Sequence, residues 1–343
     1  MNSPSQKPIN VGVIGLGFMG RTHVEAFSRA DGCDVLVVAD QDPARLTGES
    51  AEVGNLETGA AERLFDPAIV STSEEALELI DHPEVELVSI TTPTPTHLRL
   101  ARAVMASGRH LLVEKPVALD SAAIRSLAAE ARESGVLAMP AHCMRFWPAW
   151  VWMKARLDEG AYGRCIRASF LRRGAVPDWN QDFYRDETKS GGAIVDLHIH
   201  DTDFILHCFG TPAAVRSEGS RQYVSTHYEY PDGPEVMAEG GWLDDPETEF
   251  QMTARFECER GIMTFDIGRD PEVVVELADG ESKPHPEASE GGTGYDGQVR
   301  ALLDAINFGA EESPVTLDDA AETARVLEAE IASLASGGAR KVL

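Results

Sequence analysis

The sequence has few basic residues and no long apolar run. Its 30 Lys and Arg residues face 57 Asp and Glu residues, which gives a net charge of −27, and only six of the basic residues are lysine. A chain of this charge repels nucleic-acid phosphates and anionic membranes, so we expect neither as a partner. No segment approaches the roughly 18 apolar residues of a membrane-spanning helix, and the polar start MNSPSQKP lacks the apolar core of a signal peptide.

Cysteine is also scarce and unsuitably spaced for a metal or redox motif. The five cysteines are odd in number, and none of them forms a CxxC pair. This spacing excludes a zinc or redox motif of that kind and makes a disulfide framework a poor prediction. We therefore expect reduced thiols and a cytoplasmic location.

Strand and helix signals alternate in the first part of the chain, whose 343 residues are enough for two domains. Such alternation is typical of parallel βαβ units in a doubly wound sheet, and we place this domain at residues 8–140. The predicted strands are Ile9–Gly15, Asp34–Asp40, Glu86–Thr92, His110–Glu114 and Val136–Met139, and the predicted helices are Phe18–Arg29, Ser73–Ile80, Thr96–Ser107 and Ser121–Ser134.

The pattern changes after about residue 140. Short strand-like runs separated by Gly, Pro and Asp predict an α+β domain at residues 141–343 with an open, mainly antiparallel sheet. A polar, aromatic loop is predicted at Gly174–Ser190. Helices are predicted at Trp147–Glu159, Gly191–Gly210, Gln298–Asn307 and Leu317–Leu334, and the last of them could pack on the first domain.

A glycine-rich turn follows the first predicted strand and opens the first predicted helix. Gly15-Leu16-Gly17-Phe18-Met19-Gly20 has the spacing G-x-G-x-x-G. Gly15 allows a tight turn, Gly17 lets a pyrophosphate approach the backbone, and Gly20 lets helix and strand pack closely. The helix N-terminus offers N–H donors to the phosphates. This turn, with Phe18 and Met19, therefore predicts the dinucleotide site of a Rossmann domain.

An acidic residue stands where such a site needs one. Asp40 ends the second predicted strand, 20 residues beyond Gly20, and its carboxylate can accept hydrogen bonds from the ribose hydroxyls. It would repel a 2′-phosphate, and the following Gln41 and Asp42 offer no cation. Arg45 is the nearest cation, but it is better interpreted as a solvated helix residue. We therefore predict NAD in preference to NADP.

Two further segments end at the edge of the sheet where ligands bind. The third predicted strand leads into Thr92-Pro93-Thr94-Pro95-Thr96-His97, whose prolines stop the strand and shape a rigid loop. The next strand ends in Glu114-Lys115-Pro116, and proline biases Lys115 toward an extended conformation that projects into the crevice. We predict cofactor contacts from Thr92, Pro93, Thr94, His97, Glu114 and Lys115.

Together these segments resemble the glucose–fructose oxidoreductase/inositol dehydrogenase (Gfo/Idh/MocA) family. The similarity continues through GGAIVDLHIHDTD at Gly191–Asp203 to the C-terminal helix and SG-rich tail at Leu317–Gly338, so it covers almost the whole chain. The resemblance implies an oxidoreductase that acts on a sugar, a cyclitol or a related polyol.

One predicted helix concentrates titratable side chains. At helical spacing Asp196, His200 and Asp203 share one face, and a histidine beside a carboxylate suits a general base because its ordinary pKa is about 6.5. The resemblance implies that Lys115, Asp196 and His200 are the catalytic residues. On that hypothesis His200 removes the hydroxyl proton, Lys115 stabilises the oxygen, and Asp196 pairs with either of them.

Aromatic and charged residues before this helix suit a polyol, since sugars place C–H faces on rings and hydroxyls on charged groups. We predict substrate contacts from Arg145, Trp179, Tyr184 and His198. His198 and His200 form an H-x-H pair with nearby acids, but too few ligands converge on a helix, so no metal is predicted.

The sequence thus predicts an NAD(P)-dependent dehydrogenase or reductase of CH–OH groups. The family resemblance also implies a homodimer or homotetramer formed through the C-terminal sheet. Two alternatives stay open: a redox-neutral enzyme that cleaves glycosides with tightly bound NAD, and a non-catalytic sugar or nucleotide sensor.

Overall fold

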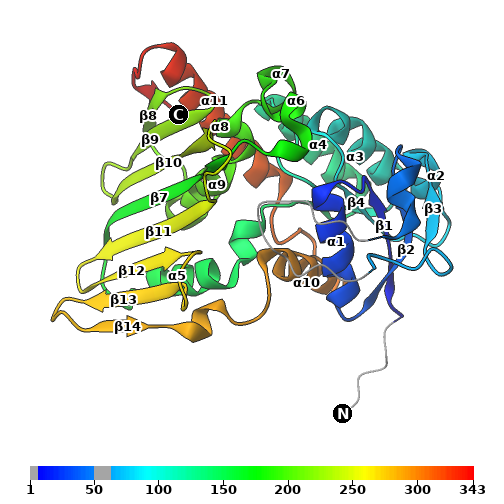
Figure 1. Ribbon diagram of the computed structural model, residues 1–343, viewed down its shortest axis with the longest axis horizontal. Helices are drawn as coiled ribbons and strands as arrows, with labels where there is room; N and C mark the ends of the chain where they lie inside the picture. Colours follow the sequence, from blue (N-terminus) through cyan, green and yellow to red (C-terminus); the bar gives the residue numbers. More distant parts are fainter. Residues whose placement is uncertain (1–6, 50–62) are drawn as a thin grey trace. The chain divides into compact units, whose positions relative to one another are not determined.

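The computed structural model describes residues 7–49 and 63–343, apart from the side chain of Trp179 (Figure 1). These residues form two compact units. The first runs through Ala118 and also contains Ala122–Ala141 and Gln298–Ala320. The second contains Leu119–Ser121, His142–Gly297 and Ala321–Leu343. Of the helices in these ranges, none is long and apolar enough to cross a membrane.

The first unit is built on a six-stranded parallel sheet with the order β3-β2-β1-β4-β5-β6. The order changes direction between β1 and β4, which is where doubly wound sheets open a ligand crevice. The strands are β1 (Ile9–Ile14), β2 (Cys33–Ala39), β3 (Ser71–Ser73), β4 (Leu87–Ile90), β5 (His110–Val113) and β6 (Ala138–Pro140). The helices are α1 (Phe18–Arg29), α2 (Ala76–Ile80), α3 (His97–Ala106), α4 (Ser121–Ser134) and most of α10 (Gly294–Asn307).

One prediction in this unit is wrong. The helix expected to start at Ser73 starts at Ala76, because Ser71–Ser73 forms the edge strand β3 beside β2. Ser73 still supports the helix start, since its hydroxyl accepts from the Glu75 N–H at 3.0 Å and donates to the Glu78 carboxylate at 2.7 Å.

The second unit contains an open nine-stranded sheet with the order β14-β13-β12-β11-β7-β10-β9-β8-β15. Only β7 and β10 pair in parallel. The strands are β7 (Cys165–Ala175), β8 (Ala214–Gly219), β9 (Tyr223–Glu229), β10 (Glu235–Leu243), β11 (Gln251–Cys258), β12 (Gly261–Asp266), β13 (Val273–Leu277), β14 (Ser282–Pro284) and β15 (Lys341–Val342). The predicted fold class, a doubly wound parallel sheet followed by an α+β domain, is confirmed.

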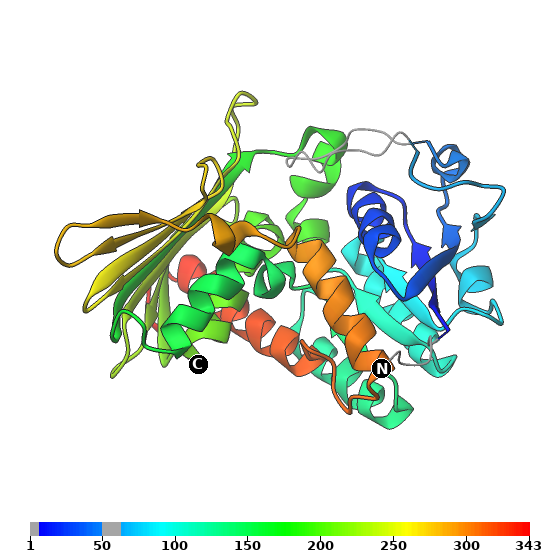
Figure 2. The same cartoon turned by 90° about the horizontal axis from the view of Figure 1, so that it is seen from below.

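Helices cover one face of this sheet and leave the other open (Figure 2). Trp150 on helix α5 (Pro148–Asp158) is fully buried, and the centre of its ring lies 4.6 Å from that of Phe204 and 5.7 Å from that of Phe265. The segment Gly174–Ser190, which we predicted as a loop, contains two short α-helices and a 3-10 turn. The helices are α5 (Pro148–Asp158), α6 (Gln181–Tyr184), α7 (Glu187–Ser190), α8 (Ala193–Asp196), α9 (Ile199–Phe209) and α11 (Leu317–Ala335).

Candidate active site

The glycine turn shows which of its glycines the fold itself requires. A Cβ on Gly20 would lie 1.8 Å from the carbonyl oxygen of Gly15, and one on Gly15, whose φ is +91°, would lie 2.9 Å from Thr92 Cγ2. A Cβ on Gly17 would meet nothing closer than Arg45 Nη1 at 3.9 Å. The space beside the Gly17 Cα is therefore not filled by other protein atoms, as expected where a pyrophosphate approaches the backbone.

The start of helix α1 is suited to an anion. Its N-cap is Gly17, and its first turn carries no acidic side chain. A helix N-terminus presents N–H groups and a partial positive charge, which favour phosphate oxygens. The turn therefore fits the diphosphate of a dinucleotide.

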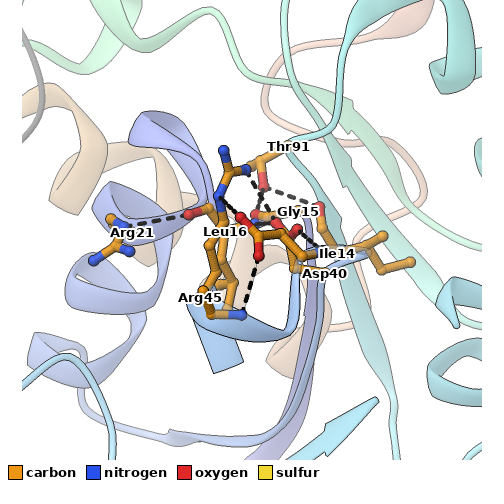
Figure 3. Close-up of polar contacts among 9 residues, drawn as sticks. Ile14, Gly15, Leu16, Arg21, Asp40, Arg45 and Thr91 are labelled. Carbon is orange, nitrogen blue, oxygen red and sulfur yellow. Dashed lines mark hydrogen bonds and ion pairs between the residues drawn. The ribbon is translucent and has the colours of Figure 1, made fainter. Parts of the chain in front are cut away.

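Thr91, which the sequence did not single out, holds this turn in place. Its hydroxyl lies 2.7 Å from the Gly15 carbonyl oxygen and 3.0 Å from that of Ile14 (Figure 3). The hydroxyl has one proton, so it donates to one carbonyl at a time. The one sequence signal for this role of Thr91 is its position near the end of the predicted strand that becomes β4, which pairs with β1.

Asp40 lies directly after β2 and faces the glycine turn (Figure 3). One carboxylate oxygen accepts from the Leu16 N–H at 2.6 Å, and the other accepts from the Asp42 N–H at 2.9 Å. The Arg45 guanidinium lies 3.4 Å from Asp40 and 3.6 Å from Asp42. Arg45 is therefore engaged by two carboxylates rather than held ready for a 2′-phosphate.

The loop after β4 lies largely against the protein. Thr92 and Thr96 share a hydrogen bond of 2.6 Å between their hydroxyls, and Thr94 is buried. His97 is 1% exposed, and both of its ring nitrogens lie within hydrogen-bond distance of backbone carbonyls. Thr92 and Pro93 retain exposed surface.

Glu114 and Lys115 differ sharply in exposure. Glu114 is 5% exposed, and its carboxylate lies 2.9 Å from His23 Nε2. Burial opposes its ionisation, but the hydrogen bond and charge of His23, together with Lys115, outweigh burial and lower the pKa of Glu114. Lys115 is partly exposed. His23 is a buried partner in helix α1 that no sequence signal indicated.

The helix predicted at Gly191–Gly210 is interrupted. Helix α8 ends at Asp196 and α9 begins at Ile199, so the single polar face predicted from regular spacing does not exist. Asp196 and His200 are both partly exposed. Within residues 196–203, the other titratable side chains are buried: His198, Asp201 and Asp203.

Asp203 belongs to a buried ion pair. Its carboxylate accepts two hydrogen bonds from Arg145, at 2.9 and 2.8 Å, and lies 3.5 Å from His142 Nδ1. Burial opposes ionisation, but Arg145 and then His142 lower the pKa of Asp203. Arg145, which we predicted to contact substrate, uses two of its guanidinium N–H groups to hold Asp203 on α9.

His198 is fully buried in a second network. Its Nε2 lies 3.1 Å from the Tyr228 hydroxyl and 3.1 Å from the carboxylate of Glu330 on α11. Burial and the Glu330 carboxylate raise the pKa of Tyr228, so its hydroxyl stays protonated and donates to Glu330 at 2.9 Å. A side chain with no exposed surface cannot serve as the substrate contact that we predicted.

Aromatic residues gather beside α8. Tyr184 is partly exposed, and its ring lies 6.1 Å from that of Trp242, which packs on Ala193 and Leu197. Trp242 lies on β10, in a run whose sequence gave no sign of a site. The side chain of Trp179 lies outside the described part of the chain. Across residues 7–49 and 63–343, no three His, Cys, Asp or Glu side chains are arranged to hold a metal.

Two models of one known protein family match this chain. Residues 9–142 match the model described as "Oxidoreductase family, NAD-binding Rossmann fold" (GFO_IDH_MocA), and residues 150–267 match the GFO/IDH/MocA C-terminal domain. Together the two models cover well over half of the chain. The chain belongs to the Gfo/Idh/MocA family. Both the resemblance and NAD as the cofactor are confirmed.

Two relatives named as inositol dehydrogenases are similar to this chain. Inositol 2-dehydrogenase 2 of Saccharopolyspora erythraea is 31% identical over 204 residues, or 59% of this chain and 54% of the relative. The scyllo-inositol 2-dehydrogenase (NAD(+)) of Bacillus subtilis is 28% identical over 205 residues, or 59% of this chain and 54% of the relative. The matches thus span about half the length of these relatives.

The Gfo/Idh/MocA fold extends over nearly the whole chain. A solved structure of levoglucosan dehydrogenase, in complex with NADH and levoglucosan, matches with a TM-score of 0.84 and covers 98% of this chain and 99% of its own. The sequence identity is 19%, so this similarity concerns the fold alone.

Proposed function

We propose that this protein is an NAD-dependent dehydrogenase or reductase that acts on a secondary alcohol, or the matching ketone, of a sugar, cyclitol or related polyol. The observation that carries the proposal lies in the segment 196–203. Of its five titratable side chains, only Asp196 and His200 keep exposed surface, while the other three serve buried pairs. A segment that buries most of its charged side chains yet leaves a carboxylate and an imidazole partly exposed is suited to proton transfer.

The proposed reaction gives distinct roles to Lys115, Asp196 and His200. The glycine turn and Asp40 would hold NAD, which would supply the acceptor for the hydride of the carbinol carbon. His200 takes the hydroxyl proton, and the Lys115 ammonium donates a hydrogen bond to the same oxygen and offsets its developing negative charge. Asp196 orients His200 or pairs with Lys115. In the reducing direction the same groups return the proton to the oxygen.

The cofactor contacts come from the first unit. Gly15, Gly17, Phe18, Met19 and Gly20 would bind the diphosphate through the turn and the start of α1, and Asp40 would accept from the ribose hydroxyls. Exposed surface on Thr92 and Pro93 favours these two residues as further contacts. Thr94, His97 and Glu114 are buried, so we propose that they hold the cofactor-binding loops in place without contacting the cofactor.

Substrate contacts are proposed from the aromatic residues of the second unit. Tyr184 and Trp179 belong to the helical segment that precedes α8. A partly exposed ring such as that of Tyr184 can bind the C–H face of a polyol. The names of the relatives point to inositols and anhydrosugars as the first compounds to try.

We also propose that two or four copies associate through the open face of the nine-stranded sheet. Outward positions there carry the exposed side chain of Met237 and a charged row in which Arg167 lies 3.0 Å from Glu235 and 3.6 Å from Glu257. A second copy would cover this face and extend the row of alternating charges. Light scattering of the purified protein should give a dimer or a tetramer, and a monomer at micromolar concentration would contradict this proposal.

A substrate panel tests the proposed reaction. Purified protein is incubated with NAD and inositol isomers, levoglucosan, aldoses and sugar acids, and both NADH absorbance and products are followed. At least one compound should yield NADH, and Lys115→Met should abolish the yield while NAD still binds. Cleaved glycoside without NADH would favour the redox-neutral alternative. Binding of sugar and NAD without any product would favour a sensor.

A further inference from the structure

His97 joins two loops of the first unit from within. It begins helix α3 and is 1% exposed. Its Nε2 lies 2.6 Å from the carbonyl oxygen of Thr92, and its Nδ1 lies 2.9 Å from that of Pro116. Thr92 follows β4 and Pro116 follows β5, and these strands are parallel neighbours. A single imidazole therefore spans the ends of two adjacent strands.

In both contacts of His97 the imidazole ring is the hydrogen-bond donor. Both partners are carbonyl oxygens, which only accept, so the ring must donate at each contact. A neutral imidazole can donate to one carbonyl and an imidazolium to both. Burial lowers the pKa of His97, whereas the two carbonyls and the Glu114 carboxylate favour the added proton and Lys115 opposes it. Either form makes at least one of the bonds, and a buried carbonyl left without a donor destabilises the folded protein.

The contact between His97 and Pro116 also helps to fix the backbone on either side of Lys115. The Glu114 N–H donates to the Ile90 carbonyl at 2.9 Å, and the Lys115 N–H donates to the Glu114 carboxylate at 3.1 Å. His97 holds the next carbonyl, that of Pro116. In the tripeptide Glu114–Pro116 only the Lys115 side chain is partly exposed, because its two neighbours are buried. The backbone around the amine is thus held on both sides.

We infer that His97 is a positioning residue that ties the loop after β4 to the segment carrying Lys115, so that the cofactor-facing loop and the amine keep one fixed separation. This inference rests on the proposed role of Lys115. It changes the role of His97 from a cofactor contact to a clamp beneath the cofactor site. A displacement of about 1 Å at a reacting group can cost roughly 10²-fold in rate, which is the order of effect a lost clamp would have.

Three substitutions separate the two halves of the clamp. In His97→Gln the amide nitrogen reaches the place of Nε2 and keeps the bond to Thr92, whereas in His97→Asn it reaches the place of Nδ1 and keeps the bond to Pro116. His97→Met fills the space and keeps neither. His82→Gln, before β4 at the opposite edge of the same sheet, serves as the control.

Hydrogen exchange of the resting protein measures the clamp without any substrate. Peptides spanning residues 91–97 and 114–118 should both exchange at least about tenfold faster in His97→Met. His97→Gln should loosen mainly the second peptide, and His97→Asn mainly the first. His82→Gln should change neither. Unchanged exchange of both peptides in His97→Met would show that His97 does not join the loops, whatever the activity of the protein.

Kinetics then tests the consequence for Lys115. With NAD and the inositol or levoglucosan that the panel shows to be oxidised, His97→Met should lose about 10–100-fold in kcat with KM for NAD within about threefold. A kcat within threefold of the unsubstituted protein would refute the positioning role. Turnover retained in Lys115→Met would instead refute the proposed function, and the exchange data would still decide whether the clamp exists.

Discussion

The glycine turn Gly15–Gly20 and the polar segment Asp196–Asp203 are both short and both carry motif residues, yet they use their residues in opposite ways. In the turn, the proposed function depends on side chains that are absent, and the space at Gly17 follows from the local backbone. In the polar segment, the proposed function depends on which charged side chains keep exposed surface. That outcome is set by partners far away in the chain, such as Arg145 for Asp203 and Glu330 for His198.

This contrast separates two kinds of evidence for a site. Room for a ligand at a glycine follows from backbone geometry within a few residues. A cluster of acids and histidines has no such meaning until burial is known, because a paired and buried charge supports the fold and only an exposed one can meet a substrate. The following predictions test two points. The first is whether the polar segment contains both structural and catalytic side chains, and the second is whether the space at Gly17 accommodates the diphosphate.

The largest effect is expected at His200. His200→Gln should lower kcat by about 10²–10⁴-fold, the usual contribution of a general acid–base group, while the free energy of unfolding changes by no more than about 0.5 kcal/mol. His198→Gln should do the reverse and act mainly on stability, because His198 is fully buried. Turnover assays and urea unfolding of both variants check the pair. Equal losses of kcat in the two variants would contradict the assignment of catalysis to His200 and of stability to His198.

A second test breaks a buried pair on the same helix. Arg172 on β7 donates to Asp201 at 2.8 and 3.1 Å, and both side chains are almost fully buried. Arg172→Met should lower the free energy of unfolding by about 3–5 kcal/mol, because it leaves a carboxylate buried without its partner. Adding Asp201→Leu should recover much of the loss. If the single variant unfolds at the same urea concentration as the parent, Asp201 is not a structural charge.

Acid should weaken the fold through Asp203. Its pKa is lowered in the folded protein, so its stabilising effect is complete above the pKa of an unfolded aspartate, about 3.9, and disappears as the pH falls through the lower folded value. The free energy of unfolding should therefore fall as the pH is lowered from about 5. In Asp203→Asn, measured over the same range, the fall should be shallower. Parallel pH curves would mean that Asp203 is not held ionised by Arg145.

Much of the first unit could be predicted from the sequence because its signals are local. The helices Phe18–Arg29 and Ser121–Ser134 begin and end where spacing placed them. The edge strand Ser71–Ser73 and the two-residue strand Lys341–Val342 escaped prediction because three or two residues carry no periodicity. They exist because a neighbouring strand offers hydrogen bonds.

The candidate site was predictable only in part, for a different physical reason. Regular spacing assumed an unbroken helix at 191–210, but the chain turns at Leu197, whose φ and ψ are −105° and −52°. The roles of Arg145 and His198 depended on Asp203 and Glu330, which only folding brings near. Thr91 and His23 act through bonds to a backbone carbonyl and to a buried carboxylate, and neither bond leaves a trace in composition or spacing.

The smallest effect is expected in the glycine turn, and it is the cleanest test of the comparison. Gly17→Ala should leave the free energy of unfolding unchanged within about 0.5 kcal/mol, since the new methyl meets no atom closer than 3.9 Å. It should raise the Kd for NAD about tenfold, which is about 1.4 kcal/mol, because the methyl occupies the space that the diphosphate needs.

Gly20→Ala is the matched opposite, since its methyl would lie 1.8 Å from the Gly15 carbonyl oxygen and must disturb the turn itself. Calorimetric titration with NAD and urea unfolding of both variants separate the two kinds of glycine. If Gly17→Ala binds NAD as tightly as the parent, the room at Gly17 is not ligand space. The turn would then resemble the polar segment, where a motif residue serves the fold alone.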